Sequence, residues 1–411
     1  MLDDKDKMLG EIFENLGGSL DIPPSKYEQA VSRYGSVGRH LEGGTYSHSV
    51  GKPAIYVQGS FRLGTVTRPF REGKDADYDI DLVCDTRSIK DLVTAGLVKA
   101  EVGDRLKSHD TYKRLLDEEG RRCWTLIYAE EDGIGFHLDV LPAIPESDYQ
   151  RLLIEAVSND LKQHSIAVTD RVESGEYNFD PSNPKGYGLW FDTKNKVMFD
   201  RVASLQKRMI VKSTTVYNSV DQVPDLLVRT PLQRLIQILK RHRDVRFDGK
   251  SNSKERPISI IISTLAALAY NNEETPWLAL EAFVKSVEDY QTSKVIRKRN
   301  GEWRIPNPTN LAENFADRWN DDDGKRAKAF FEWVAILRQD LLSMRTIETI
   351  PGLQEHLAPM FGESQVKTAF GNFGKALQTT SSSGNLKMVH GSGLLGTSAG
   401  IPVKSHNFYA D

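Results

Sequence analysis

Cysteine is scarce in this chain of 411 residues, which contains only Cys84 and Cys123. A disulfide scaffold and a four-cysteine zinc module are therefore excluded. No run of about 18 apolar residues occurs, so we expect no membrane span. The N-terminus is acidic and amphipathic and lacks the basic-then-apolar order of a signal peptide. These features predict a protein of the reducing cytoplasm.

An excess of one charge sign is also missing, since 54 Lys and Arg residues face 57 Asp and Glu residues and the formal net charge is −3. This balance argues against a strongly basic protein that coats nucleic acid. The nine histidines include no H-E-x-x-H motif and no cluster with metal-ligand spacing. The sequence GSGLLGTSAG near the C-terminus lacks the G-K-[ST] of a phosphate-binding loop.

The hydrophobic pattern divides the chain into four parts. Residues 1–45 predict two helices that brace a larger domain, the second starting after two prolines. Residues 46–150 predict a mixed α/β catalytic core, and residues 151–374 predict a mainly helical lobe. Residues 375–411 are rich in Gly and Ser and predict a flexible tail, because they bury too little apolar surface to offset chain entropy.

Four local patterns give more specific expectations. Residues 152–164 form an amphipathic pattern that predicts one helix, and residues 258–270 are apolar nearly all round, which predicts a central buried helix. A strand that starts at Gly135 is expected to end at Pro142. Asn300-Gly301 predicts the turn of a hairpin.

The segment 58–83 is the most informative one. Its last part, residues 78–83, alternates between polar and apolar residues and predicts a strand. In this strand Asp79 and Asp81 share one face, about 6.5–7 Å apart, while Ile80 and Leu82 face the core. Two such carboxylates repel each other unless a cation lies between them, and Mg²⁺ prefers carboxylate oxygens. The alternative is a solvated strand face that binds no metal.

A third carboxylate, Asp139, lies in a second alternating stretch, FHLDVLPA. Phe136, Leu138 and Val140 share one face of the predicted strand, and His137 and Asp139 share the other. Because neighbouring strands lie about 4.8 Å apart, we expect Asp139 to join the other two around a pair of ions. Two metals about 3.5–4 Å apart stabilise the attacking and leaving oxygens of an in-line phosphoryl transfer.

Gly59 and Ser60 directly follow a short strand signal at residues 54–57. A glycine there permits close backbone approach, and backbone N–H groups with the Ser60 hydroxyl predict a cradle for the phosphates of a nucleoside triphosphate. By itself a Gly-Ser pair is most often a plain turn. The combination of strand, Gly-Ser, short helix, paired aspartates and a later single aspartate is far more specific.

This combination resembles the DNA polymerase β-like nucleotidyltransferase superfamily, and within it the cGAS/DncV-like nucleotidyltransferases of bacterial CBASS anti-phage systems. The likeness covers roughly residues 25 to 350 and includes NPTNLAENFADRW, residues 307–319. It implies an α+β fold with a nucleotidyltransferase α/β lobe, a helical lobe similar to poly(A) polymerase and oligoadenylate synthase, and an active-site cleft between them. The residues that carry it are Gln58-Gly59-Ser60-Phe61 with Thr65, Tyr78-Asp79-Ile80-Asp81-Leu82, and Leu138-Asp139-Val140.

The resemblance implies a role for each matched residue. Asp79, Asp81 and Asp139 would hold two Mg²⁺ ions, or Mn²⁺ in their place, with Asp139 also helping to activate a ribose hydroxyl. In the helical lobe, Lys240 and Ser259 match residues that clamp the phosphate tail. For Lys240 the alternative is a solvated helix face, and for Ser259 a hydroxyl bonded to its own helix. Nucleotide binding is further implied for Gln58, Gly59 and Ser60.

The implied activity is synthesis of a cyclic tri- or dinucleotide second messenger from ATP and GTP, with cyclic AMP-AMP-GMP as one candidate product. Two alternatives stay open. One is a template-independent enzyme that tails RNA, and the other is an inactive nucleotide-binding or antitoxin-like module. A downstream effector would sense the product.

Two further partner expectations follow from the family. No Cys/His insert is present, so activation by DNA is not expected. The tail, which ends in His406-Asn407-Phe408-Tyr409-Ala410-Asp411, resembles the segment that a ubiquitin-transfer-like partner enzyme conjugates. Asp411 departs from the small terminal residue expected of such a tail, and a plain disordered end is the alternative.

Overall fold

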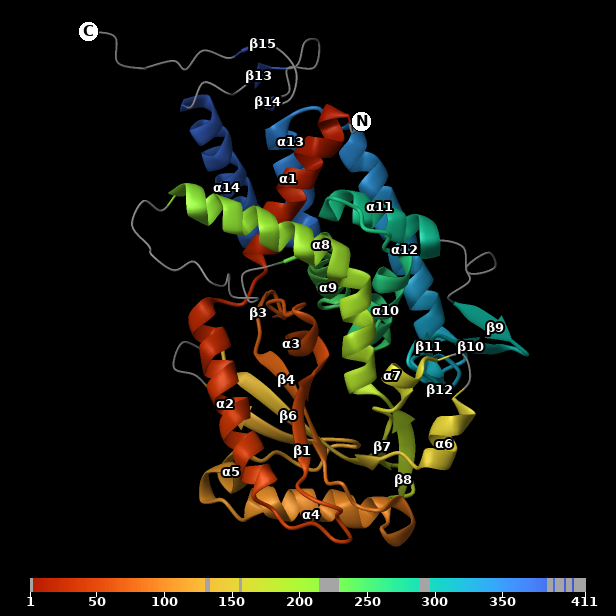
Figure 1. Ribbon diagram of the computed structural model, residues 1–411. Coiled ribbons are helices and arrows are strands. Elements are labelled where there is room, and N and C mark those ends of the chain that lie inside the picture. The colour runs from red at the N-terminus through yellow and green to blue at the C-terminus, as the bar shows by residue number, and fades with distance from the viewer. Residues whose placement is uncertain are drawn as a thin grey trace. The chain divides into compact units, whose positions relative to one another are not determined.

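The computed structural model describes residues 3–129, 134–154, 157–213, 229–287 and 296–382, with the pairs 387–388, 395–396 and 401–402 (Figure 1). The chain divides into two compact units. The sheet unit comprises Ile22–Lys196 and Val295–Gly324, and the helical unit comprises Met1–Asp21, Val197–Lys294 and Lys325–Asp411. These bounds differ from the expected ones, because residues 22–45, 151–196 and 295–324 belong to the sheet unit and residues 1–21 to the helical unit.

A six-stranded mixed sheet forms the centre of the sheet unit, with strand order β1-β4-β6-β7-β8 and β5 paired with β6. β4 and β6 run parallel, and the other neighbours in this sheet are antiparallel. This arrangement agrees with the predicted α+β nucleotidyltransferase lobe. The strands are β1 (Ala54–Gln58), β4 (Tyr78–Asp85), β5 (Trp124–Tyr128), β6 (Phe136–Pro145), β7 (Ile166–Arg171) and β8 (Tyr177–Ser182).

β6 is longer than predicted, because it continues through Pro142 to Pro145. The Ala143 carbonyl accepts from the Thr86 N–H on the β4 side, so the neighbouring residue Pro142 directs its nitrogen to the other side. On that side, pairing with β5 ends at Val140 and pairing with β7 begins at Ala143. The missing N–H of proline therefore falls in a gap between two ladders, where it costs no hydrogen bond.

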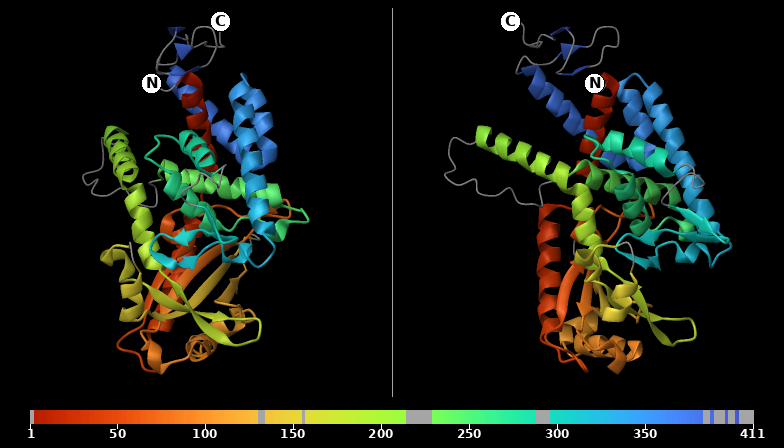
Figure 2. Two further views of the ribbon diagram at one scale, coloured as in Figure 1. Left: turned by 90° about the vertical axis from the view of Figure 1, so that its right-hand side faces the viewer. Right: turned by 45° about the vertical axis from the view of Figure 1, so that its right-hand side comes forward.

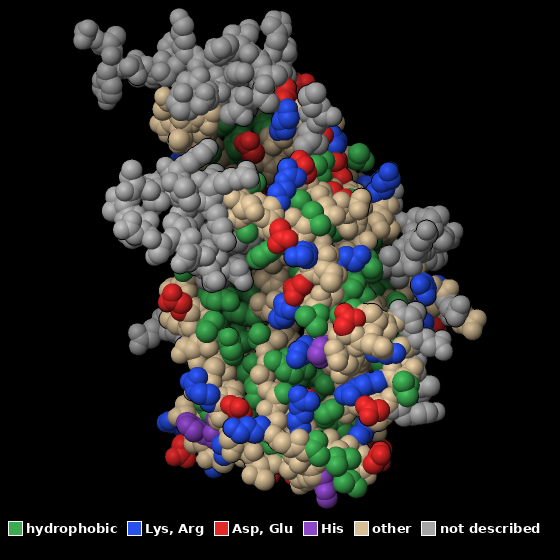
Figure 3. All heavy atoms as spheres, in the orientation of Figure 1, with side chains coloured by type: hydrophobic (Ala, Val, Ile, Leu, Met, Phe, Trp, Pro, Cys, Tyr) green, Lys and Arg blue, Asp and Glu red, His purple; other side chains and the backbone are tan. Residues whose placement is uncertain are grey.

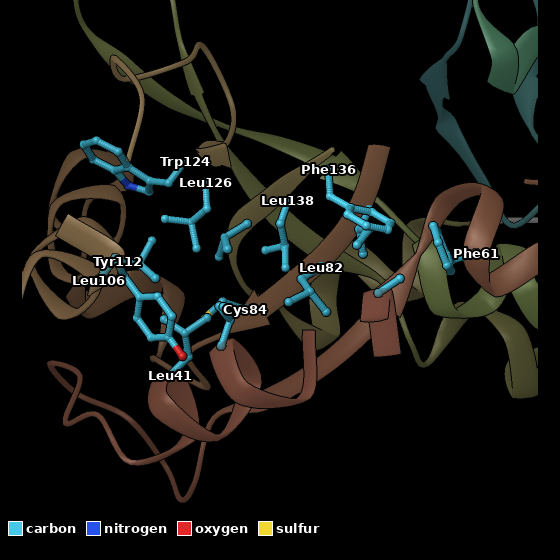
Figure 4. Packing of buried hydrophobic residues seen from close by; sticks show 14 of the residues in the cluster. Leu41, Phe61, Leu82, Cys84, Leu106, Tyr112, Trp124, Leu126, Phe136 and Leu138 are labelled. Atoms are coloured by element: carbon cyan, nitrogen blue, oxygen red, sulfur yellow. The ribbon is translucent and has the colours of Figure 1, made fainter. Parts of the chain in front are cut away.

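One face of the sheet is the core of this unit (Figure 4). Ile80 and Leu82 of β4 and Leu138 of β6 are at most 1% exposed, as the alternation predicted. α2 (Pro24–Glu42) and α4 (Ala95–Lys107) cover this face with residues such as Val37 and Val102. In the right view of Figure 2, α2 lies along the strands that it packs against.

Short elements complete the first part of the sheet unit. They are α3 (Gly59–Leu63), β2 (Phe70–Arg71), β3 (Lys74–Asp75), a 3-10 turn at Lys90–Leu92, α5 (Asp110–Leu115), α6 (Asp148–Leu153) and α7 (Asn159–Lys162). The single helix predicted for 152–164 is wrong. Ile154 leaves the helical conformation with ψ 85° and buries its side chain, while Leu152 is 72% exposed. Burial of Ile154 therefore outweighs the helical period.

The segment 296–324 returns to the sheet unit as β9 (Arg297–Arg299), β10 (Glu302–Arg304), β11 (Pro306–Asn307), β12 (Asn310–Asn314) and a 3-10 turn at Asp317–Trp319. The hairpin predicted at Asn300-Gly301 is confirmed. Glu313 of β12 accepts hydrogen bonds from Asn307 at 2.7 Å and from Ser182 of β8 at 3.2 Å. Polar residues of the stretch 307–319 thus attach the segment 296–324 to the sheet.

The pKa of Glu313 is raised to about 7, mainly because the carboxyl is buried, although Asn307, Ser182 and Arg122 favour the charged form. The folded state therefore keeps a proton that the unfolded chain releases at lower pH. Stability from this group is lost as the pH rises from the unfolded pKa toward 7. We predict that the free energy of unfolding of the wild type falls by on the order of 1–2 kcal/mol between pH 5 and pH 8 because of Glu313. Glu313→Gln should remove this decrease.

Urea unfolding of both proteins at the two pH values measures this difference. Glu302→Gln is the matched control, because Glu302 lies exposed on β10 of the same segment. An identical pH dependence in the wild type and Glu313→Gln would show that Glu313 is not protonated in the fold.

The helical unit is built around a buried helix. It contains α1 (Asp4–Ser19), α9 (Pro231–Phe247), a 3-10 turn at Ser253–Glu255, α10 (Ser259–Ala269), α11 (Pro276–Val287), α12 (Lys325–Thr346), α13 (Ile350–Phe361) and α14 (Glu363–Ser382). α8 (Pro184–Ser213) begins in the sheet unit and continues into this one. In α10, the residues from Ile261 to Ala267 are all buried, which confirms the predicted central helix.

Ion pairs between side chains, as well as apolar packing, hold α1 and the residues just after it against α9. Arg234 of α9 donates to Glu14 at 2.9 Å and to Asp21 at 2.8 Å. The Phe13 ring lies edge-on to Trp277 and Phe361, with ring centroids 5.4 Å and 6.0 Å away. Of the two predicted bracing helices, α1 therefore stabilises the helical unit and α2 stabilises the sheet.

The predicted tail begins too early, because α14 extends to Ser382. Its last turns are polar, but the Thr379 and Thr380 hydroxyls bond to carbonyls four residues earlier, which is compatible with a helix. Beyond it, β13 (Lys387–Met388) pairs with β14 (Leu395–Gly396) and β15 (Ile401–Pro402). The expected recognition residues His406–Ala410 and Asp411 lie outside the described residues.

Across the described ranges, no helix combines the length and the apolar character that a membrane crossing requires. In the lower half of Figure 3, over the sheet unit, Lys and Arg side chains are interspersed with Asp and Glu. This face therefore does not form one basic field, in line with the balanced composition.

Candidate active site

The parallel pairing of β4 with β6 brings the predicted carboxylates together. Asp81 is paired with Asp139, and Asp79 is paired with His137. All four side chains extend from the face opposite the core, because Ile80, Leu82, Leu138 and Val140 occupy the buried face. The expectation that two adjoining strands carry the three aspartates on one face is confirmed.

Each carboxylate of this acidic face has a different neighbour. The Thr125 hydroxyl of β5 donates to Asp139 Oδ1 at 2.5 Å. His137 Nδ1 lies 3.6 Å from Asp79 Oδ1, and Asp81 Oδ2 lies against the backbone of Gly59. Within the described part of the chain, no three His, Cys, Asp or Glu side chains converge into a metal-ligand group. The sequence therefore predicted the shared face correctly, but not how the side chains are oriented on it.

Burial and neighbouring charges shift the pKa values of Asp139 and His137 on the acidic face. Burial raises the pKa of Asp139, and the charge of Asp79 adds to this shift, while the Thr125 hydrogen bond lowers it. The pKa of His137 is raised, chiefly by Asp79 and despite burial, with further contributions from Asp77 and Asp139. Carboxylates close enough to act on each other and on a histidine in this way favour a bound cation.

The residues present fit a hard divalent cation in their chemistry. The donor set consists of carboxylate oxygens, the ligands that Mg²⁺ prefers, and Asp81 and Asp139 lie directly across one strand pair. Gly59 packs directly against Asp81, where a Cβ would overlap the carboxylate. Asp79, Asp81 and Asp139 are the side chains that would hold such an ion.

Gly59 begins α3 immediately after β1, so the predicted strand, Gly-Ser and short helix are confirmed. Its φ of +63° lies in the left-handed region, and a Cβ at this position would overlap Asp81 Oδ2. Gln58, the residue before it, is paired with Asp81 across β1 and β4. Glycine therefore lets the turn pack directly on the second carboxylate.

α3 is held at its other end by Arg62. Its guanidinium donates to both carboxylate oxygens of Asp192 on α8, at 3.2 Å and 2.5 Å. Gly188, one turn earlier on α8, leaves room for this arginine, since a Cβ there would lie 3.0 Å from Arg62 Nε. Ser60, between the two anchored ends, is partly exposed.

We predict that Gly59→Ala reduces the expected nucleotidyl transfer by at least about 10²-fold, because Asp81 or the turn must move by around an ångström. Gly249→Ala is the matched control, since Gly249 has a φ of +64° and a Cβ there would meet nothing within 4 Å. Both variants carry the backbone strain of about 1–2 kcal/mol, and only one clashes with a carboxylate. Turnover and thermal unfolding of both variants give the comparison, and equal losses of turnover would contradict it.

Lys240 and Ser259 lie in the helical unit. Lys240 is only 5% exposed, which contradicts the alternative of a solvated face of α9. The Ser259 hydroxyl, at the start of α10, is exposed and accepts a hydrogen bond from Arg243 of α9 at 3.1 Å, rather than bonding to its own helix. Contact of either residue with a nucleotide, and a cleft between the lobes, stay predictions.

The sequence did not show which aspartate each neighbour on the acidic face contacts. Thr125 is the register partner of Asp139 on β5, and His137 is that of Asp79 on β6. Asp77 Oδ1 accepts the Gly135 N–H at 2.6 Å, which ties the start of β4 to the start of β6. Strand alternation places Thr125 and His137 on this face, but only the register shows which aspartate each one meets.

Comparison with known proteins gives relatives over nearly the whole chain. No family model matches. A c-di-GMP synthase of Roseivirga ehrenbergii is 25% identical over 98% of this chain and 97% of its own length. The cyclic dinucleotide synthase CdnG of Bradyrhizobium diazoefficiens is 24% identical over 90% of this chain and 84% of its own. The solved structure of that CD-NTase with GTP covers 90% of this chain and 100% of its own, with 20% identity and a TM-score of 0.63.

Proposed function

Because the chain belongs to the cGAS/DncV-like nucleotidyltransferases, we propose that it is a cyclic oligonucleotide synthase. The observation that carries this proposal is the acidic face, where Asp81 pairs with Asp139, Asp79 extends from the same side, and the Gly59 turn packs against Asp81. Relatives named as cyclic dinucleotide synthases support the reaction class, since their similarity covers both lobes.

GTP is the substrate that the comparisons favour. One relative is named a c-di-GMP synthase, and the solved structure of another holds GTP. Of the two ring sizes that the sequence left open, these names favour a cyclic dinucleotide with guanine over a trinucleotide such as cyclic AMP-AMP-GMP. ATP remains a candidate second substrate.

The proposed reaction joins nucleotides by two transfers. A ribose hydroxyl of one nucleotide bonds to the α-phosphorus of the next, the bond from that phosphorus to the β-phosphate bridging oxygen breaks, and pyrophosphate leaves. Asp139 accepts the hydroxyl proton. Asp79, Asp81 and Asp139 would hold two Mg²⁺ ions, which would neutralise phosphate charge when bound. In a second transfer of the same kind, the free ribose hydroxyl of the linear product bonds to the α-phosphorus of its own triphosphate, a second pyrophosphate leaves, and the ring closes.

The remaining matched residues hold the donor triphosphate. Gln58, Gly59 and Ser60 bind it through the turn between β1 and α3, where the backbone approaches the acidic face. Lys240 and Ser259 contact its phosphates from α9 and α10 of the helical unit.

Three finer expectations belong to the same proposal. The enzyme works in the cytoplasm, its product activates a downstream effector in anti-phage defence, and a ubiquitin-transfer-like partner conjugates its C-terminal tail. The signal for the last expectation lies in residues 406–411, outside the described ranges.

The proposal predicts that the purified chain converts nucleoside triphosphates to small phosphatase-resistant products. The full chain is incubated with all four labelled triphosphates and Mg²⁺ or Mn²⁺, and the products are treated with phosphatase and identified by mass. Asp79→Asn with Asp81→Asn should remove synthesis and leave thermal unfolding nearly unchanged, costing several kcal/mol of barrier, or at least about 10³-fold in rate.

Asp104→Asn is the matched control, because Asp104 is 76% exposed on α4, away from the acidic face. Unchanged synthesis in the double variant would refute the assignment of the aspartates. Elongation of a labelled RNA without cyclic product would instead identify the RNA-tailing alternative. Nucleotide binding with no turnover by the wild type would identify the inactive module.

A further inference from the structure

The Thr125 hydroxyl makes the shortest described contact to the acidic face. Its Oγ1 donates to Asp139 Oδ1 at 2.5 Å. This lies within the 2.5–2.7 Å range of charge-assisted O–H···O⁻ bonds, which are roughly twice as strong as neutral ones. By comparison, His137 lies 3.6 Å from Asp79. Of these two carboxylates, Asp139 is the one with a closely bound donor.

The strand register makes this contact specific. Thr125 on β5 is paired with Asp139 on the antiparallel strand β6. Its neighbours Trp124 and Leu126 are buried on the core face, at 5% and 0% exposure, so Thr125 is directed to the acidic face. A strand needs no hydroxyl at this position, because valine has the same shape and an equal preference for strands. The polar role of Thr125 therefore concerns Asp139 and not the sheet.

Asp139 has a physical need for such a partner. The carboxylate torsion of an aspartate is broad and settles only when something holds it. On this face the charge of Asp79 also acts on Asp139, and repulsion alone would turn the carboxylate away. A donor fixed on the neighbouring strand binds one oxygen and so sets the direction of the other.

We propose that Thr125 is a positioning residue whose hydroxyl fixes the orientation of the Asp139 carboxylate for cation binding and nucleotidyl transfer. This inference rests on the proposed function for its catalytic part. Its cation-binding part concerns only the acidic face. Partners that orient metal ligands typically contribute about 10–100-fold in metal affinity or activity.

The test compares Thr125→Val and Thr125→Ser in the full chain. Mn²⁺ binding to the protein alone is measured from the free-ion signal in electron paramagnetic resonance, and turnover of GTP with Mn²⁺ gives kcat and KM. We expect Thr125→Val to weaken Mn²⁺ binding about 10–100-fold and to lower kcat with KM within a few-fold of the wild type. Thr125→Ser keeps the hydroxyl and should retain both.

Thr169→Val is the matched control. Thr169 is 0% exposed on β7 of the same sheet, and within the described residues its hydroxyl has no hydrogen-bond partner. This substitution should leave Mn²⁺ binding and kcat unchanged. If Thr125→Val fails to fold, Thr125→Ser and Thr125→Ala give the same comparison, because both lack the methyl group and differ in the hydroxyl.

Wild-type Mn²⁺ affinity in Thr125→Val, or equal impairment in Thr125→Ser and Thr125→Val, would overturn the positioning role. The two proposals fail in different ways. If the wild type makes no cyclic product but Thr125→Val still weakens Mn²⁺ binding, the orientation of Asp139 stands and the proposed function falls. If the wild type makes product and Thr125→Val matches it in kcat and Mn²⁺ binding, only the positioning role falls.

Discussion

The parallel pairing of β4 with β6 is the constraint on which the site depends. It sets Asp81 opposite Asp139 and Asp79 opposite His137, while the alternate residues of both strands fill the core. Since side chains alternate along a strand, a shift of one residue in either strand would exchange its polar and apolar faces. Burial of Ile80, Leu82 and Leu138 therefore fixes the positions of the carboxylates, and the hydrophobic core and the acidic face are two results of one register.

A second coupling joins the turn after β1 to the same carboxylates. Gly59 packs against Asp81, and Gln58 of β1 is the register partner of Asp81 on β4. The pairing of β1 with β4 therefore sets the proposed triphosphate-binding turn beside the acidic face. On the other side, β5 supplies Thr125 to Asp139. The turn after β1 and the strand β5 thus each provide a group beside the aspartates. The nucleotide turn, the ligands and their positioning group are built on rigid backbone rather than on loops.

The sequence allowed much of this face to be predicted, because strand alternation is a strong local signal. The shared side of Asp79, Asp81 and Asp139 and the strand-to-helix turn at Gly59 followed from spacing alone. The contacts of Thr125 and His137 did not, since they depend on which strand pairs with β6 and in what register. The end of β6 was wrongly predicted at Pro142 for the same reason. Whether this proline costs a hydrogen bond depends on the gap between the ladders that β6 forms with β5 and with β7. The burial of Lys240 could not be predicted either, because the pattern of α9 does not show what packs around it.

Neither compact unit is continuous in sequence, and this affects how the protein is made. The chain passes between the units after residues 21, 196, 294 and 324. During synthesis the sheet can form early, yet β8 waits for Glu313 and Asn183 waits for the Thr309 carbonyl, both well over a hundred residues downstream. A nascent chain therefore carries an incompletely bonded catalytic sheet for much of translation. A truncated product from this gene would retain all three aspartates but lack the segment that closes the edge of their sheet.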